Sequence, residues 1–469
     1  MRIPEKDLLK GAVHFMLLIS LSACGVTNEY KKPDVAFPES YRGGLISAKG
    51  SLADSSVAML PYSSFFADKT LCLLIDSSVA NSIDLLVALK NIDYARQTLN
   101  ASKLGLLPTL NVGAQNTRTN PSDNGAKTNI DDYSASATSS WEVDIWGKIR
   151  SRNRSALASY LKTQEAAKAV RTRLVADVAS GYYNLLMLDV QLASSKKNLA
   201  LADTTVKMIA LQYDAGQVTS LAVQQQEALR LSIEGSLPAI EQKIAVQENA
   251  LSILCGRMPG AIERDRALFT INVIDDLPSG IPSALLQNRP DVRAAELAVR
   301  GAHADMGEAK ATLYPSLTVT AAGGVEAFKA SNWFTLPGSI FGLVQGAVLQ
   351  PIFQRGQLKA KYEQSKIKRD QSELEFKQTL LKAVGEVSNA LVALDKIKSQ
   401  ELIAAERVAT LQGALTNAGL LFRSGMATYL EVIVSQSNAL QAELALADIR
   451  RQHLAAKAEL YRSLGGGWR

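Results

Sequence analysis

The 469-residue sequence has few of the residues that build catalytic and metal sites. It contains three cysteines and three histidines, and His14, His303 and His453 lie far apart along the chain. No metal-ligand spacing, no Gly-x-Ser-x-Gly motif and no phosphate-binding glycine loop occurs in it. We therefore expect neither an enzyme nor a metal site.

The sequence also has only a small excess of positive over negative charge. The 51 Lys and Arg residues are nearly balanced by 45 Asp and Glu residues, and the two signs are interspersed along the chain. This balance does not favour a nucleic-acid partner. A disulfide framework is not expected either, because only Cys72 and Cys255 follow the first segment, and they could pair or stay free.

Proline is missing from two long stretches, between Pro121 and Pro238 and after Pro351. A helix from Gly147 to Asp214 would have 68 residues and a length of about 100 Å. Such a helix is far longer than is usual in globular proteins. It indicates either a coiled coil or bundle, or a pair of hairpins that span a wide compartment.

The pattern around the long helices occurs twice. Its recurring residues are separated by 209 positions in four pairs, which are Gly147 and Gly356, Gly216 and Gly425, Thr219 and Thr428, and Leu221 and Leu430. A shared offset of this size predicts an internal duplication of roughly half the chain.

The beginning of the chain predicts a processing segment. A short basic region precedes an apolar stretch that is too short to span a bilayer. Leu21–Cys24 then resembles a bacterial lipobox, in which the cysteine carries a covalent lipid. We predict a signal peptide at 1–23 and a tether at 24–60 that is lipidated on Cys24. The resemblance to bacterial lipoproteins implies that Gly25 after the cysteine favours transfer to the outer membrane.

The hydrophobic period changes from 3.6 to 2 after Pro108 and again after Pro315. Runs of about ten residues with one apolar and one polar side predict β-hairpins at about 109–146 and 316–353, although residues 340–349 alternate poorly. An ordinary half-buried surface hairpin has the same pattern as a strand pair of an outer-membrane barrel. Candidates for the membrane–water interface are the aromatic residues Tyr133, Trp141 and Trp146.

Four strands are too few to cross a membrane by themselves. A membrane barrel has to close so that no strand edge is left unpaired in lipid, and known barrels begin at about eight strands. Two chains would supply eight strands, whose interior side chains fill. Three chains would supply twelve, enough for a water-filled lumen, so a conduit favours a trimer.

Several short motifs, in their order along the chain, carry a resemblance to a known family. They are Leu21–Cys24, Trp141–Lys148, Glu248–Leu251 with Gly256–Gly260, Asn288–Arg293 with Ala295 and Glu296, and Leu464–Trp468. Together they resemble the TolC-like outer membrane factors, and in particular the efflux-system lipoproteins of the NodT subgroup. The resemblance covers nearly the whole chain.

The resemblance implies a mainly α-helical fold with a β-barrel segment. It implies a trimeric periplasmic α-barrel continued by a twelve-stranded outer-membrane β-barrel, with four strands per chain and an internal two-fold repeat. The first repeat would cover 61–257, an equatorial linker 258–281, and the second repeat with its C-terminal tail 282–469.

The same resemblance implies a function and a set of partners. The protein would be the passive exit duct for small molecules of a tripartite efflux pump. Its partners would be a periplasmic adaptor, an inner-membrane pump of the resistance–nodulation–division type, two further copies of itself and outer-membrane lipid. A periplasmic helical-hairpin adaptor lipoprotein without a pore is the alternative, and it predicts no membrane strands.

The resemblance assigns the adaptor-docking tip to the two helix–helix turns. The residues are Asp214, Gly216, Thr219 and Leu221 in the first turn and Arg423, Gly425, Thr428 and Leu430 in the second. Ordinary turn chemistry also explains them, since glycine adopts a positive φ without strain and threonine favours the start of a helix. Asp214 is the candidate for a periplasmic gate, and the second turn has no equivalent acid.

Overall fold

The computed structural model describes residues 26, 28–34, 38, 41–42, 56–66, 68–119, 130–264, 267–271 and 282–469, which fall into two compact units. The sheet unit consists of the described residues among 1–34, 91–163 and 294–377. The helical unit consists of those among 35–90, 164–293 and 378–469. Each unit therefore takes segments from both halves of the chain. The predicted lipidation residue Cys24 lies outside the described residues.

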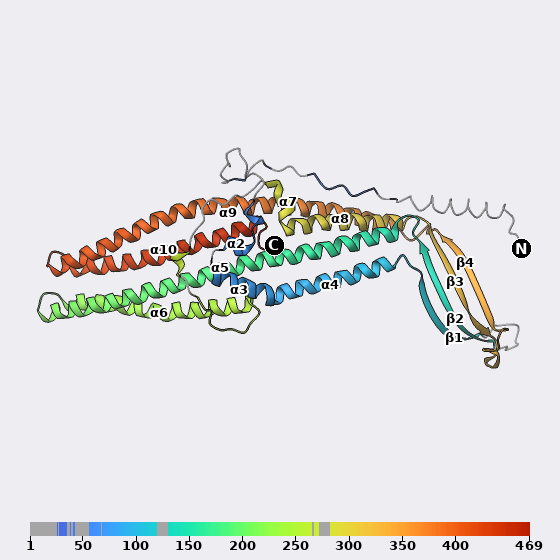
Figure 1. Ribbon diagram of the computed structural model, residues 1–469, viewed down its shortest axis with the longest axis horizontal. Helices are drawn as coiled ribbons and strands as arrows, with labels where there is room; N and C mark the ends of the chain where they lie inside the picture. The colour runs from blue at the N-terminus through green and yellow to red at the C-terminus, as the bar shows by residue number, and fades with distance from the viewer. Residues whose placement is uncertain are drawn as a thin grey trace. The chain divides into compact units, whose positions relative to one another are not determined.

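The described chain is mainly helical (Figure 1). Its elements are the α-helices α2 (Tyr62–Phe65), α3 (Lys69–Asn81), α4 (Ile83–Leu104), α5 (Lys148–Asp214), α6 (Ser220–Leu254), α7 (Leu285–Asn288), α8 (Pro290–Ala311), α9 (Gln357–Arg423) and α10 (Tyr429–Ser463), the strands β1 (Thr109–Thr119), β2 (Ile130–Val143), β3 (Ser316–Ala327) and β4 (Ile340–Leu349), and four short 3-10 helices.

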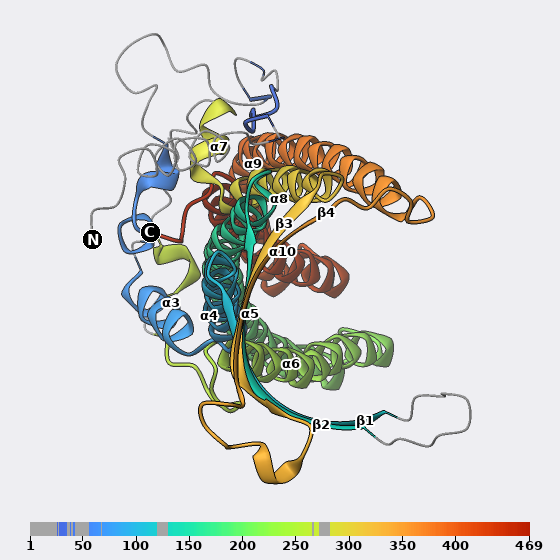
Figure 2. The same cartoon turned by 90° about the vertical axis from the view of Figure 1, so that its right-hand side faces the viewer.

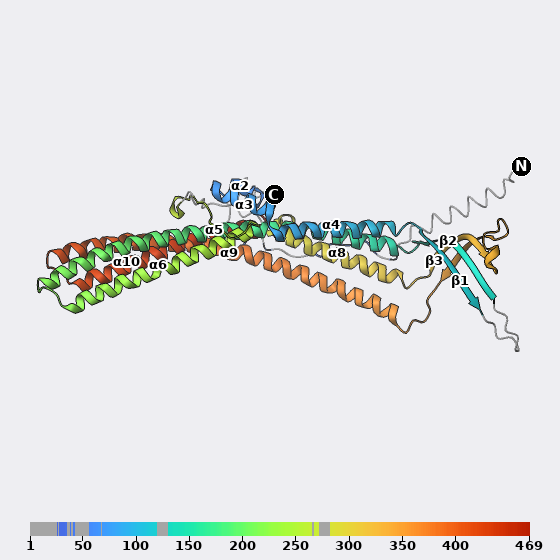
Figure 3. The ribbon, with the colours of Figure 1, turned by 90° about the horizontal axis from the view of Figure 1, so that it is seen from below.

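The predicted long helices are confirmed. Both α5 and α9 have 67 residues, and both α6 and α10 have 35. In the helical unit, α5 with α6 and α9 with α10 form two antiparallel hairpins whose turns lie at the same end (Figures 1 and 3). Near these turns Ile209, Ala222, Phe422 and Val432 pack in one buried cluster, so the two hairpins contact each other within one chain.

Proline affects two helices in ways that the residue pattern does not predict. The apolar pattern before Pro315 predicts one approach helix from about Pro282 to Leu313, but α8 begins only at Pro290, because Arg289 before it is extended. A residue that precedes proline is disfavoured in helical backbone, whereas proline itself suits the first helical position. Proline inside a helix also predicts an interruption and a kink at Pro238, but α6 continues through this residue from Ser220 to Leu254. The kink stays a prediction.

The four strands form one antiparallel sheet in the order β1-β2-β3-β4 (Figure 1). The strands lie within the two predicted hairpins, 109–146 and 316–353. Strand β4 also forms, although its sequence alternates poorly. Pairing of β2 with β3 joins the two hairpins over eleven residue pairs, from Tyr133–Ala327 to Val143–Leu317. Strands β1 and β4 are consequently the two edges of the sheet in this chain.

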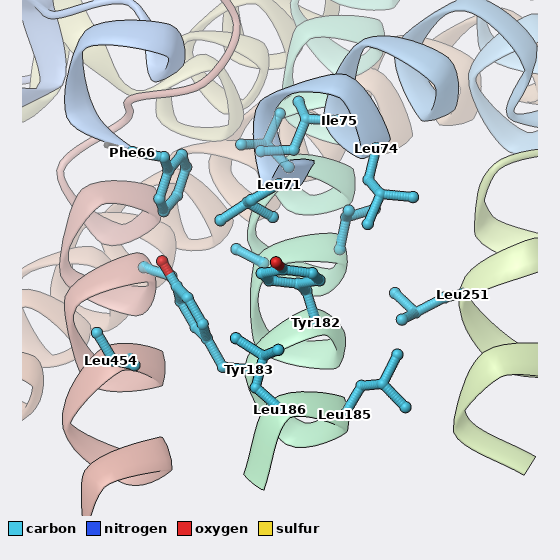
Figure 4. Packing of buried hydrophobic residues seen from close by; sticks show 14 of the residues in the cluster. Phe66, Leu71, Leu74, Ile75, Tyr182, Tyr183, Leu185, Leu186, Leu251 and Leu454 are labelled. Carbon is cyan, nitrogen blue, oxygen red and sulfur yellow. The ribbon is translucent and has the colours of Figure 1, made fainter. Parts of the chain in front are cut away.

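The core of the helical unit surrounds the middle of α5. Tyr182, Leu185 and Leu186 on α5 point towards α3, α6 and α10, where they meet side chains such as Leu71, Leu251 and Leu454 (Figure 4). The Tyr182 hydroxyl donates a hydrogen bond of 3.2 Å to Asp68, a buried residue that caps α3. Residues of the region 65–80, Ile262, Leu268 and Ile271 at the described linker, and Tyr461 near the C-terminus belong to this same buried cluster.

Cys72 and Cys255 are both free thiols, and Cys255 is buried.

Among the described residues no single helix combines the length and hydropathy needed to cross a bilayer. Helices α3 and α4, bent by 41°, reach that threshold only as a pair.

Glycine at the end of α6 is required by a close backbone approach. Gly256 has φ +65°, and a Cβ placed there would lie 2.1 Å from the carbonyl oxygen of Asn81. Gly235 in the middle of α6 has open space around it. Gly256→Ala should therefore lower the apparent melting temperature of the detergent-solubilised protein.

The matched control, Gly235→Ala, should raise the melting temperature slightly, since alanine stabilises a helix interior by about 0.5–1 kcal/mol relative to glycine. Thermal unfolding followed by circular dichroism measures both variants. Equal melting temperatures for the two would contradict the close approach at Gly256.

Candidate functional site

The sheet has two chemically distinct faces. Side chains alternate between the faces along a strand, and residues paired across strands share a face. Tyr133 pairs with Ala327, Ala137 with Gly323, Trp141 with Val319 and Val143 with Leu317, all on one apolar face. The other face carries the pairs Ser134–Glu326, Thr138–Ala322 and Glu142–Thr318.

The apolar face continues to both edges. Leu110 and Val112 of β1 lie on it opposite Ser139 and Ala137, and Ile340, Val344 and Val348 of β4 lie on it opposite Val325, Ala321 and Leu317. Val112 is 82% exposed and Val344 is 79% exposed. A contiguous apolar surface of this kind usually marks contact with a partner or a membrane.

Strand β4 is the exception to the alternation. Phe341 and Leu343 lie on the polar face, opposite Gly324 and Ala322. This explains why the sequence of this strand alternates poorly.

The three aromatic residues predicted for a membrane interface lie at two opposite ends of β2. Near the end that leads to α5, the Trp141 indole N–H donates to the Leu106 carbonyl at 2.9 Å, and that of Trp146 donates to the Pro315 carbonyl at 2.7 Å. Tyr133 lies near the other end, where its ring is 5.8 Å from that of Trp333. Their role at a membrane stays a prediction.

The two helix–helix turns are built alike. After α5, the N–H of Gly216 donates to the Tyr213 carbonyl at 2.9 Å, and that of Gln217 donates to the Gln212 carbonyl at 2.8 Å. Gly216 has φ +74°. These are the two bonds of a Schellman motif, which favours glycine because the backbone is left-handed there.

The second turn repeats this geometry. Gly425 also has φ +74°, its N–H donates to Phe422 at 3.1 Å, and the Met426 N–H donates to Leu421 at 2.9 Å. Thr219 and Thr428 are the N-cap residues of α6 and α10, as the sequence predicts. The predicted tip residues Asp214, Leu221, Arg423 and Leu430 are all exposed in the helical unit.

The turns differ in charge. In the second turn the Glu431 carboxylate accepts a hydrogen bond of 2.6 Å from the Thr428 N–H, whereas the equivalent position of the first turn is the buried Ala222. The first turn carries Asp214 at the end of α5, and the second carries Arg423 at the end of α9.

A single protein-family model, that of the outer membrane efflux proteins, matches residues 74–257 and again residues 281–466. The chain belongs to the outer membrane efflux protein family. Its fellow members are transport proteins, so this chain is not an enzyme.

Individual relatives agree with this assignment. The chain is 29% identical to the probable efflux pump outer membrane protein TtgC of Pseudomonas putida, over 99% of this chain and 96% of the relative. It is 28% identical to the outer membrane protein OprJ of Pseudomonas aeruginosa, over 98% of this chain and 96% of the relative.

Solved structures show the same fold. The open state of the MtrE outer membrane channel of Neisseria gonorrhoeae has a TM-score of 0.85 and is 25% identical, and the match covers 95% of this chain and 99% of that one. A membrane protein from Pseudomonas aeruginosa has a TM-score of 0.86 and is 26% identical, with 94% and 100% covered.

Two motifs that carried the family resemblance contact each other in this efflux protein. Buried Arg289 donates to Asp291 at 2.6 Å, to Glu386 at 2.9 Å and to the Ser463 carbonyl at 3.0 Å. The Trp468 indole N–H donates to the Asn288 carbonyl at 3.1 Å. Burial opposes ionisation of Asp291, but the hydrogen bond and charge of Arg289 prevail and hold its pKa below the ordinary value. These motif residues therefore stabilise the helical unit.

Sequence reasoning missed the docking of the N-terminal segment. In the sheet unit, Lys32 forms an ion pair of 2.8 Å with Glu296 on α8, and a ring nitrogen of His303 lies 3.0 Å from the Asn28 carbonyl oxygen. The Tyr30 ring lies 5.8 Å from that of His303, and burial, with a smaller contribution from Glu296, raises the pKa of Tyr30 to about 12. A short polar segment gives no periodic signal, so only the structure reveals this contact.

The Glu431 bond predicts a local effect. Glu431→Ala removes the acceptor of the Thr428 N–H, and N-terminal capping interactions contribute about 1 kcal/mol. Hydrogen exchange of the amides at 428–432 should become several-fold faster, while the first turn stays unchanged.

Glu406→Ala, at an exposed position in the interior of α9 and 17 residues before its end, is the control and should leave exchange at both turns unaltered. Unchanged exchange at 428–432 in Glu431→Ala would show that the carboxylate does not hold the second turn.

Proposed function

We propose that this chain forms the outer-membrane exit duct of a tripartite efflux pump, a passive channel for small molecules. Family membership supports this function, and one structural observation carries it. The four-stranded sheet has a continuous exposed apolar face, a polar opposite face and two open edges. An apolar face of this kind suits lipid, and a polar face suits a water-filled lumen.

The open edges favour a trimer. Among the described residues strand β1 pairs only with β2 and strand β4 only with β3, so each has one edge without a partner strand there. Unpaired backbone groups are not tolerated in hydrocarbon. Three copies would close a twelve-stranded barrel, in which β1 of one copy pairs with β4 of the next.

The distance between the aromatic residues along β2 is consistent with a membrane role for them. Tyr133 and Trp141 are eight positions apart on β2, which is about 26 Å along a strand. A strand tilt of about 40° reduces this to about 20 Å of height, near the apolar band of about 25 Å in outer-membrane barrels. Tyr133 would lie near one interface, with Trp141 and Trp146 near the other.

Exposed apolar residues on the long helices support the predicted α-barrel. Leu374, Leu381 and Leu402 on α9 are 66%, 74% and 68% exposed. Neighbouring copies would cover them in a trimeric periplasmic α-barrel. The internal repeat is supported by glycines with positive φ that recur 209 positions apart, namely Gly147 with Gly356, Gly216 with Gly425 and Gly256 with Gly465.

The exposed turns suit the predicted partners. A periplasmic adaptor would bind the turn residues around Gly216 and Gly425, and an inner-membrane pump of the resistance–nodulation–division type would supply the energy. Asp214 would form a three-fold acidic ring at the gate, where rings of carboxylates favour cations.

The N-terminal segment supports a lipid on Cys24. From Asn28 to Lys32 the segment contacts α8 first at His303 and then at Glu296, so it runs antiparallel to that helix. Asn28 thus lies nearer the end of α8 that leads to β3 than Lys32 does. A lipid on Cys24, four positions earlier in the sequence, would suit this placement of the segment.

A pore-free adaptor lipoprotein is the less favoured function. It would leave the apolar face of the sheet exposed to water, and the family match argues for a channel.

Deletion of the gene tests the function. The deletion strain should become more sensitive to some toxic compounds, because the pump loses its exit across the outer membrane. Susceptibility is measured across a broad compound panel, and the wild-type gene supplied in trans should restore resistance. Unchanged sensitivity to the whole panel, while the partner pump is active, would count against the proposal.

A second experiment separates the channel from its lipid. Cys24→Ala, exported with a signal peptide that is not lipidated, should lose the lipid mass but remain a trimer in the outer membrane with efflux largely intact. Cys72→Ala is the control and should keep the lipid. Release of Cys24→Ala into the periplasm would mean that the lipid alone holds the protein at the membrane.

A further inference from the structure

The connection between β3 and β4 exposes several large apolar side chains. This β3–β4 loop, residues 328–339, presents Phe328 at 70%, Phe334 at 69% and Leu336 at 63% exposure. Singly exposed apolar residues are common, but three in a loop of twelve residues indicate a surface that something covers.

The loop is folded rather than extended. The Glu326 N–H donates to the Ser339 carbonyl at 2.8 Å, which closes the base of the loop. Inside it, the Thr335 N–H donates to the Asn332 carbonyl at 3.1 Å, and the Ile340 N–H donates to the Pro337 carbonyl at 3.2 Å. A hydrogen-bonded backbone therefore holds the apolar side chains outward.

The loop adjoins the apolar face of the sheet. The Trp333 ring lies 5.8 Å from that of Tyr133, which belongs to the apolar face, and 4.9 Å from that of Phe334. Figure 2 shows the loop at the end of the strands, away from the ends that lead to the helices. The exposed loop side chains thus extend the surface that would contact lipid.

The charge of the loop also suits a membrane surface. Between Ala327 and Ser339 the sequence contains a single charged residue, Lys329, and it is exposed. Aromatic side chains beside a lysine are typical of segments that lie at a membrane interface, where the cation meets phosphate groups.

We propose that the β3–β4 loop inserts into the outer leaflet of the outer membrane as a second, non-covalent anchor. Phe328, Phe334 and Leu336 contact the acyl region, and Lys329 contacts the lipid phosphates. The inference rests on the proposed function, because it requires the sheet to span the membrane. The loop of a neighbouring copy could instead cover these side chains above the pore. The contact between Trp333 and Tyr133, however, places the loop on the apolar side of the sheet.

Site-specific photo-crosslinking tests this inference. A benzophenone amino acid replaces Phe334 in the full-length protein, which is reconstituted into vesicles of phosphatidylethanolamine and lipopolysaccharide. The matched control is Ser331→p-benzoylphenylalanine, an exposed polar position of the same loop. A reference for the sheet is Val344→p-benzoylphenylalanine, on the apolar face.

After irradiation, mass spectrometry should find lipid adducts at 334 in a yield similar to that at 344 and several-fold above that at 331. Adducts at 344 combined with none at 334, or crosslinks between copies at 334, would overturn the loop inference alone. Absence of lipid adducts at 344 as well would overturn the membrane-spanning sheet and with it the proposed function.

Discussion

Hydrogen bonding at the sheet edges is the constraint on which the proposed assembly depends. In the part of the chain that the structure describes, strands β1 and β4 each leave one row of backbone N–H and C=O groups without a strand partner. Water could satisfy these groups, but hydrocarbon could not. In the proposed membrane setting the exposed apolar face would contact lipid, and the edges in contact with lipid would have to be paired. A membrane channel built from this sheet would therefore need more than one chain.

Much of the fold follows from the sequence because the signals are long and repeated. Proline-free stretches and a change of period at Pro108 and Pro315 locate the long helices and all four strands. The paired glycines locate the turns, since a left-handed residue at the end of a helix is strongly selective for glycine. Start positions such as that of α8 were less predictable, because the conformation of Arg289 depends on one neighbouring proline.

The parts that sequence reasoning missed depend on tertiary contacts. Nothing in the sequence around Asn28–Lys32 indicates that this segment packs along α8 through His303 and Glu296. The role of Arg289 could not be predicted either, because its partners Glu386 and the Ser463 carbonyl lie 97 and 174 positions away in the sequence. Long-range polar contacts of this kind leave no periodic trace.

The irregular strand β4 has a consequence for the order of assembly. It carries apolar residues on both faces, with Val344 and Val348 on one and Phe341 and Leu343 on the other, and its outer edge is open. An open apolar edge promotes unspecific strand pairing and aggregation. A folded single chain would therefore be short-lived in water. If copies associate as proposed, association would have to follow soon after each sheet forms, so that the lone protomer spends little time in water.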